Sequence, residues 1–65
     1  MNTNFRKIEK TIVAGGWALD RVNGSHYLYK KEGCLPIVIP NHKGRDLSIG
    51  VIKNLESITG LSLRR

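Results

Sequence analysis

The segment Gly24-Ser25-His26 holds the side chain of this chain best suited to acid–base catalysis. An imidazole has a reference pKa near about 6.5, so it takes up and releases a proton at neutral pH without elaborate tuning. RNA cleavage needs little more: the 2′-hydroxyl loses a proton as it attacks the adjacent phosphorus, and the departing 5′-oxygen gains one. A well-placed histidine accelerates such proton transfers by about 10² to 10⁴.

Cations beside this histidine would stabilise the charge that gathers on the phosphoryl oxygens. Lys30 is expected on the same strand face as His26, and Arg21 lies across the turn that precedes it. We expect Arg21, Ser25 and Lys30 to contact RNA. A lone histidine at a strand start is more often a packing or surface residue than a catalyst, so a non-catalytic reading of His26 stays open.

A second histidine, His42, follows in a polar loop with Lys43 and Arg45. It is either a second proton-transfer group or, as we favour, a cap of the loop through its ring nitrogens. Lys43 and Arg45 are predicted phosphate contacts, with a solvated surface as the alternative.

Metal and cofactor chemistry find little support in the sequence. The solitary Cys34 has too few partners for a zinc site, and the spacing of His26, His42 and the carboxylates matches no common ligand pattern. Phosphate-cradling glycine motifs do not occur. We therefore expect no metal and no cofactor.

Aromatic side chains offer another route to nucleic acid, because exposed rings stack on unpaired bases. The chain has only four aromatic residues, and a small core needs most of them. We expect Trp17 in the core and one of Tyr27 and Tyr29 exposed.

Helical spacing of apolar residues marks both ends of the chain. Phe5, Ile8, Ile12 and Val13 predict a helix over about residues 4–14 that ends at Gly15-Gly16, with Arg6, Lys7, Glu9 and Lys10 outward. A second stripe, made by Val51, Ile52, Leu55 and Ile58, predicts a helix with Lys53, Asn54 and Glu56 outward. Asp46 or Ser48 caps its start, and Gly60 stops it.

Alternating apolar and polar residues between these helices predict three strands. Trp17, Leu19 and Arg21 alternate with their neighbours, and the dipeptide Asn23-Gly24 suits the two positive φ values of a tight hairpin turn. The second strand runs to about residue 31. A third run over residues 35–39 contains Pro36, which predicts a sheet edge or a bulge.

These elements predict an α+β fold, with a helix, a three-stranded antiparallel sheet and a helix in one domain over residues 1–65. Two helices on one sheet face bury both apolar stripes and leave the other face free for a ligand. The double-stranded-RNA-binding domain has the same element order, an analogy that by itself fixes no function.

Net charge points to a polyanionic partner. Eleven Lys and Arg against five Asp and Glu give +6 over 65 residues, and the surplus is spread along the chain. One cysteine forms no internal disulfide, and no apolar run approaches the roughly 20 residues of a membrane span. We expect a cytoplasmic protein without a membrane segment.

Several motifs in this order resemble the HicA family of mRNA interferase toxins, over about Phe5 to Ser62. They are Gly16-Trp17, Gly24-Ser25-His26-Tyr27-Leu28-Tyr29, Val38-Ile39-Pro40-Asn41-His42, and the helix that Gly50 opens and Gly60-Leu61-Ser62 ends. The resemblance implies the fold described above and a ribonuclease that cuts mRNA and arrests translation. It implies His26 as the catalytic residue and a HicB-like antitoxin as partner. The chain departs from the family at Gly50-Val51-Ile52, where the family often has a threonine second.

Two other functions fit the residues without the resemblance. A non-catalytic RNA-binding module would share the fold and the charge, and its binding would weaken steeply with salt. A protein-interaction domain would instead present its basic face to an acidic partner.

Overall fold

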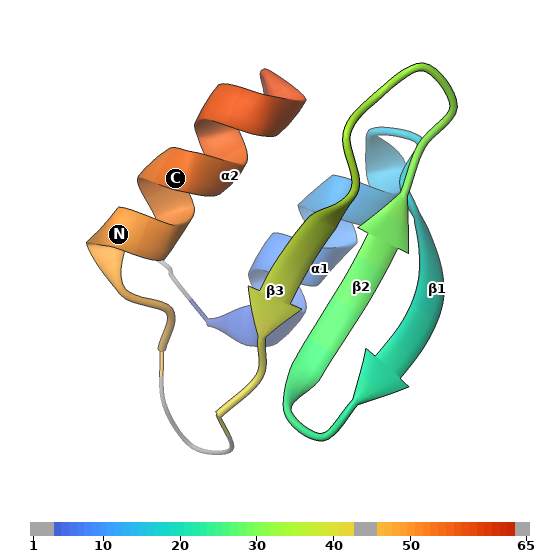
Figure 1. Ribbon diagram of the computed structural model, residues 1–65. Coiled ribbons are helices and arrows are strands. Elements are labelled where there is room, and N and C mark those ends of the chain that lie inside the picture. Colours follow the sequence, from blue (N-terminus) through green and yellow to red (C-terminus); the bar gives the residue numbers. More distant parts are fainter. Residues whose placement is uncertain (1–3, 43–45, 64–65) are drawn as a thin grey trace.

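A computed structural model describes residues 4–42 and 46–63 of the chain (Figure 1). Its elements are α1 (Phe5–Ala14), β1 (Ala18–Asn23), β2 (His26–Lys30), β3 (Ile37–Pro40) and α2 (Ile49–Thr59). The strands form one antiparallel sheet in the order β1-β2-β3. This confirms the predicted α+β order, and it is consistent with a double-stranded-RNA-binding-like fold.

Both helices pack on one face of the sheet, and the core lies between them. Alternate residues of β2 and β3, namely Tyr29, Ile37 and Ile39, are buried against the stripes of α1 and α2. The stripe residues that are buried are Phe5, Ile8, Ile12, Ile52 and Leu55. Val13 was predicted in the first stripe but is 51% exposed, because it falls at the edge of the helical face in the last turn.

Local caps set the limits of the second helix. The Ser48 hydroxyl accepts a hydrogen bond from the Val51 backbone N–H at 3.3 Å, so the serine, and not Asp46, caps α2. Gly60 ends the helix with φ +73°, the left-handed conformation that glycine adopts most cheaply. Both ends were predicted from the sequence, with the choice of cap left open.

The hairpin between β1 and β2 turns one residue later than predicted. Asn23 is still in β1 and pairs with His26, so the two loop residues are Gly24 and Ser25. Within this turn only Gly24 has a positive φ, +62°, so the prediction of two positive values at Asn23-Gly24 is wrong. Glycine in the first loop position gives a tight turn that matches strand twist without a left-handed asparagine.

A bulge interrupts β1. The register shifts between Leu19, which pairs with Tyr29, and Arg21, which pairs with Leu28, so Asp20 is the extra residue. Directly opposed residues project on the same face of a sheet. Leu19 therefore lies on the helix side with Tyr29, whereas Arg21 lies on the opposite face with Leu28. The simple alternation predicted for this strand does not hold past the bulge.

The third strand begins later than predicted, at Ile37, so Pro36 precedes it. As predicted from that proline, β3 lies at an edge of the sheet. A proline has no N–H to give to a ladder, which is why pairing starts after it.

Polar bonds tie the outer side of each helix to the rest of the fold. Tyr29 donates its hydroxyl to the Glu9 carboxylate, so Glu9 is half-buried rather than outward as predicted. Burial and then this carboxylate raise the pKa of the Tyr29 hydroxyl well above its usual range. Glu56 was also predicted outward, yet it accepts the backbone N–H of Leu63 at 2.8 Å.

Within residues 4–42 and 46–63, no helix combines the length and apolar character that crossing a membrane requires.

Candidate functional site

The face of the sheet that carries no helix, here called the open face, is defined by the strand pairings. Arg21 lies opposite Leu28, Asn23 opposite His26, and Leu28 opposite Val38. These five residues line a shallow cavity of about 340 Å³. Because the cavity draws on all three strands, residues far apart in the sequence meet there.

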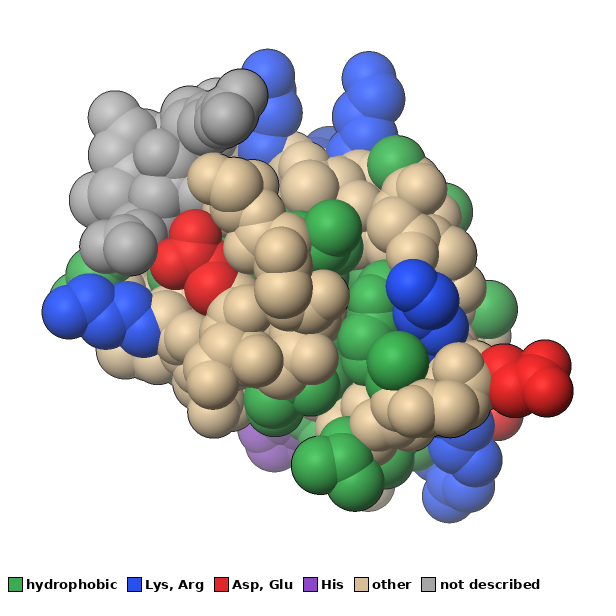
Figure 2. Space-filling model, turned by 90° about the horizontal axis from the view of Figure 1, so that it is seen from above, with side chains coloured by type: hydrophobic (Ala, Val, Ile, Leu, Met, Phe, Trp, Pro, Cys, Tyr) green, Lys and Arg blue, Asp and Glu red, His purple; other side chains and the backbone are tan. Residues whose placement is uncertain are grey.

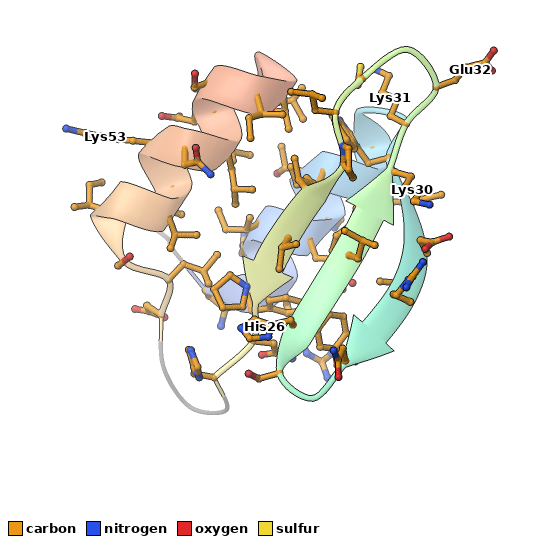
Figure 3. All side chains as sticks on the ribbon, viewed as in Figure 1. His26, Lys30, Lys31, Glu32 and Lys53 are labelled. Carbon is orange, nitrogen blue, oxygen red and sulfur yellow. The ribbon has the colours of Figure 1, made fainter. Side chains whose placement is uncertain are left out.

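His26 is the first residue of β2 and stands exposed at one end of the open face (Figure 3). As a residue of the central strand it pairs with Asn23 on one side and with Pro40 on the other. The backbone N–H of Asn41 donates to the Ser25 carbonyl at 2.7 Å, which ties the chain after β3 to the turn before His26. The imidazole therefore projects into solvent from a backbone held on both sides.

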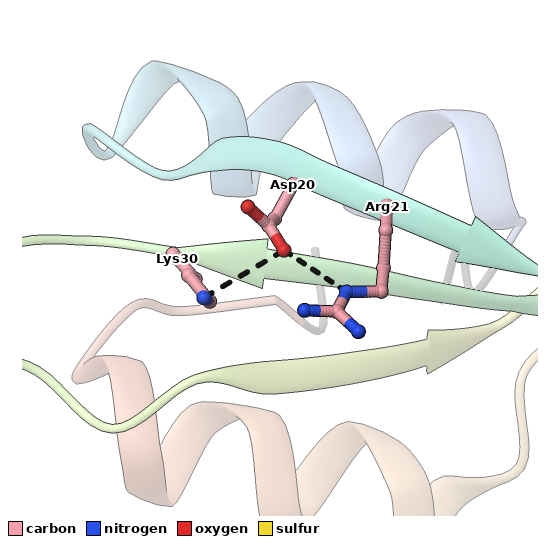
Figure 4. A network of polar contacts seen from close by, with 3 residues as sticks. All are labelled: Asp20, Arg21 and Lys30. Carbon is pink, nitrogen blue, oxygen red and sulfur yellow. Dashed lines mark hydrogen bonds and ion pairs between the residues drawn. The ribbon is translucent and has the colours of Figure 1, made fainter.

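Arg21 reaches the same cavity because the bulge at Asp20 turns it onto the open face. Its Nε donates to the Asp20 carboxylate at 3.2 Å, and the Nζ of Lys30 lies 3.7 Å from the same oxygen (Figure 4). One carboxylate thus orients two cations and offsets part of their charge. All three side chains remain solvent-accessible, so their charges are available to a ligand.

Lys30 shares the open face with His26 but lies at the other end of β2 (Figure 3). The two residues are four positions apart in an extended strand, which is about 13 Å at about 3.3 Å per residue. The side chains of His26 and Lys30 are therefore placed to contact different phosphates of a bound RNA strand, not the same phosphate.

The remaining residues that were predicted to contact RNA do not line the cavity of His26 in the described structure. Ser25 is half-buried in the turn, and Lys43 and Arg45 lie outside the described residues. His42 is exposed and lines a second cavity of about 280 Å³, whose other lining residues are Pro40, Asp46, Leu47, Ser48 and Val51. In the described structure His42 thus borders the start of α2, outside the cavity of His26.

The expectation that one of Tyr27 and Tyr29 is exposed, and so free to stack on a base, is wrong. Trp17 is 2% exposed and Tyr29 is fully buried, the first of these as expected. Tyr27 is half-buried and packs edge-to-face on Phe5 with ring centroids 4.9 Å apart, so neither tyrosine is exposed. The second-strand alternation sends both tyrosines to the helix side.

Leu28 and Val38 hold the central positions of the open face instead, and sequence reasoning did not single them out. Neither did it single out Asn23, which lines the cavity with them. The signal was present in the alternation itself, since Leu28 stands between two core tyrosines and Val38 between two core isoleucines.

Charge and metal-binding groups complete the description of the surface. On the face seen in Figure 2, Lys and Arg side chains project at several separate points. Within the part of the chain that the structure describes, no three His, Cys, Asp or Glu side chains gather as metal ligands would.

A comparison with protein families places this geometry in context. Residues 5–61 match a family described as the HicA toxin of bacterial toxin–antitoxin systems. The chain belongs to the HicA toxin family. The matched region runs from the first residue of α1 past the end of α2, so it contains every described residue of the cavity. A second comparison, with curated proteins, found no match.

HicA membership settles the broad role of the chain. It is a toxin of a toxin–antitoxin system, a context that implies an antitoxin as partner. HicA toxins are generally ribonucleases, and on the open face of this chain a histidine and an arginine line one cavity.

Proposed function

We propose that this HicA-family toxin is an endoribonuclease that cleaves mRNA in the cytosol and so inhibits translation and growth. The observation that carries the proposal is the meeting of exposed His26 and Arg21 at one cavity on the open face. Proton transfer and phosphate stabilisation are the two functions that cleavage at a 2′-hydroxyl requires, and these side chains supply one each.

The proposed reaction uses the RNA itself as nucleophile. Neutral His26 takes the proton of the 2′-hydroxyl, whose oxygen then forms a bond to the adjacent phosphorus. The bond from phosphorus to the 5′-oxygen breaks, and that oxygen takes a proton from the imidazolium. The products are a 2′,3′-cyclic phosphate and a 5′-hydroxyl, and His26 ends neutral. These steps need no metal ion.

Arg21 stabilises the phosphoryl oxygens as charge develops on them. Its guanidinium lies at the wall of the same cavity and is oriented by Asp20, so little ordering is needed when RNA binds. Lys30 is proposed to hold a neighbouring phosphate. Ser25, Lys43 and Arg45 remain predicted RNA contacts.

Cleavage of a long mRNA by the purified protein in EDTA tests the proposal. We expect His26→Ala to lower the cleavage rate by about 10² to 10⁴, the usual contribution of a general acid–base group. His42→Ala is the matched control, because it removes the other exposed imidazole outside the cavity; it should still cleave.

Three outcomes would contradict this account. Equal cleavage by the wild type and His26→Ala would remove His26 from the reaction. Loss of cleavage in EDTA would mean that a metal ion takes part. Binding of RNA without any new RNA ends would favour the non-catalytic RNA-binding module.

The partner is proposed to be a HicB-like antitoxin that covers the open face. A basic surface attracts an acidic partner through electrostatic steering, and covering His26 is enough to prevent catalysis. Histidine modification by diethyl pyrocarbonate should therefore be suppressed at His26 in the complex. Undiminished modification of His26 in a complex that is catalytically silent would contradict this mode of inhibition.

A further inference from the structure

Leu28 and Val38 form an apolar floor in the middle of a polar surface. They are directly opposite each other on β2 and β3, and both line the cavity of about 340 Å³. Val38 is 48% exposed and Leu28 is half-buried, and neither belongs to the core that holds the helices. Burying them against a ligand would therefore remove apolar surface from water at no cost to the fold.

Polar groups bound this floor along the strand direction. Asn23 and His26, which pair with each other, lie at one end of the cavity, and Lys30 lies beyond the other end (Figure 3). Arg21 pairs with Leu28 beside the floor, and its guanidinium shares the Asp20 carboxylate with Lys30. A largely apolar pocket with a few polar groups is the usual form of a small-molecule site, and the volume is at the low end of the roughly 300–1,000 Å³ range. One flat ring system suits a site of this size.

The order of groups along β2 is His26, the apolar floor, and then Lys30, whose cation shares the Asp20 carboxylate with Arg21. A nucleic-acid strand alternates charged phosphates with flat, largely apolar bases, so it complements this order when one base turns toward the sheet. In a duplex the bases are stacked and paired, and proteins recognise double-stranded RNA mostly through its shape, phosphates and 2′-hydroxyls. An apolar floor that adjoins this pair of cations suits an unpaired base.

We propose that Leu28 and Val38 form a nucleobase subsite next to the cleaved phosphate, which makes unpaired single-stranded RNA the substrate. The inference rests on the proposed ribonuclease function and adds the element that selects the strand. Asn23, which lines the same cavity, presents an amide with both donor and acceptor groups to the edge of that base. The aromatic residues, all directed to the core side, have no part in the subsite.

Binding of a defined RNA separates this subsite from simple charge attraction. The probe is a single-stranded RNA of about ten nucleotides, a length within the usual range of single-strand sites, with 2′-methoxy groups that prevent cleavage. The same strand annealed to its complement, and a series with one base removed at each position in turn, are the comparison ligands. Fluorescence anisotropy measures each affinity.

Val38→Ser tests the floor, and Val22→Ser is its matched control. Both valines are 48% exposed and lie in strands, but Val22 pairs with Tyr27 and so lies on the helix side of the sheet. We expect Val38→Ser to weaken single-strand binding by roughly three- to ten-fold, as loss of one base contact does, and to leave duplex binding unchanged. Val22→Ser should change neither.

The expected pattern also includes tighter binding of the single strand than of the duplex, and a loss of affinity at one position of the base-removal series. Equal or tighter duplex binding, a flat series, or equal effects of the two serine variants would each overturn the subsite. None of these results affects cleavage by the wild-type protein. Conversely, base-dependent binding without cleavage would refute the ribonuclease proposal and leave the subsite standing.

Discussion

Replacing Asp20 by asparagine should strengthen RNA binding, although Asp20 touches both predicted phosphate-binding cations of the open face. Its carboxylate lies 3.2 Å from Arg21 Nε and 3.7 Å from Lys30 Nζ. The three charges sum to one positive charge, whereas the variant would leave both cations uncompensated. The bulge that places Asp20 between these cations is formed by backbone pairing. Because asparagine has the same shape as aspartate, we expect the Asp20→Asn variant to keep the bulge.

The size of the gain follows from the geometry. A phosphate oxygen about 3 Å beyond the Arg21 guanidinium is about 6 Å from the Asp20 carboxylate, which the ion pair places 3.2 Å away on the other side. The repulsion at about 6 Å is about 0.7 kcal/mol in a water-like dielectric and about 3 kcal/mol at an effective dielectric constant near 20. The Asp20 side chain is 35% exposed, so solvent screening favours the lower value. We expect at least about a three-fold gain in affinity.

Salt dependence gives a second measure of the same effect. One more effective cation should steepen the slope of log K against log salt by about 0.7, the value per phosphate for a single strand. Anisotropy with the uncleavable single-stranded RNA, repeated over a salt series, measures both quantities. Glu32→Gln is the matched control, since it removes the same charge from an exposed loop residue at the end of β2 remote from His26 (Figure 3).

Two results would refute this reasoning. Unchanged or weaker binding by Asp20→Asn would show that orienting Arg21 matters more than offsetting its charge. An equal gain from Glu32→Gln would show that the net charge of the molecule, and not the position of Asp20, sets the affinity.

Further predictions concern stability, measured by urea unfolding. The raised pKa of Tyr29 means that the folded state keeps this proton while the unfolded chain loses it above about pH 10, so stability falls as the pH rises; Tyr29→Phe should remove that part of the loss. Gly24→Ala should cost about 1 kcal/mol because φ is +62°, whereas Gly50→Ala in α2, with open space at its Cβ, should gain about 0.5–1 kcal/mol. Ser48→Ala should cost about 1 kcal/mol through the lost cap; no change would assign the cap elsewhere.

Much of the fold could be read from local patterns. Helical spacing at Phe5, Ile8 and Ile12 and strand alternation around Tyr27 and Tyr29 each depend on which face of an element meets the core, and the structure confirms both. Glycine at Gly60 marks a helix end because a left-handed residue is required there. Such signals are encoded within a few residues, so a sequence displays them directly.

Other features depend on contacts between distant residues and escaped prediction. Glu9 looks like a solvent-facing helix residue until the Tyr29 hydroxyl, twenty positions later, bonds to it. The bulge at Asp20 cannot be recognised from the alternation of residues in β1, because pairing with β2 decides which residue of β1 is unpaired. Without the bulge, Arg21 would lie on the face of Trp17 and Leu19.

The sequence by itself determined the chemical groups of the site: a histidine after a tight turn, a net charge of +6, and motifs that resemble the HicA family. Only the tertiary structure decided which other residues lie beside these groups. It brought Arg21 to the cavity of His26 through the bulge, and it paired Leu28 with Val38 at the floor of that cavity. The physical reason is that a sheet face is assembled by pairing between strands, and register sets each neighbour.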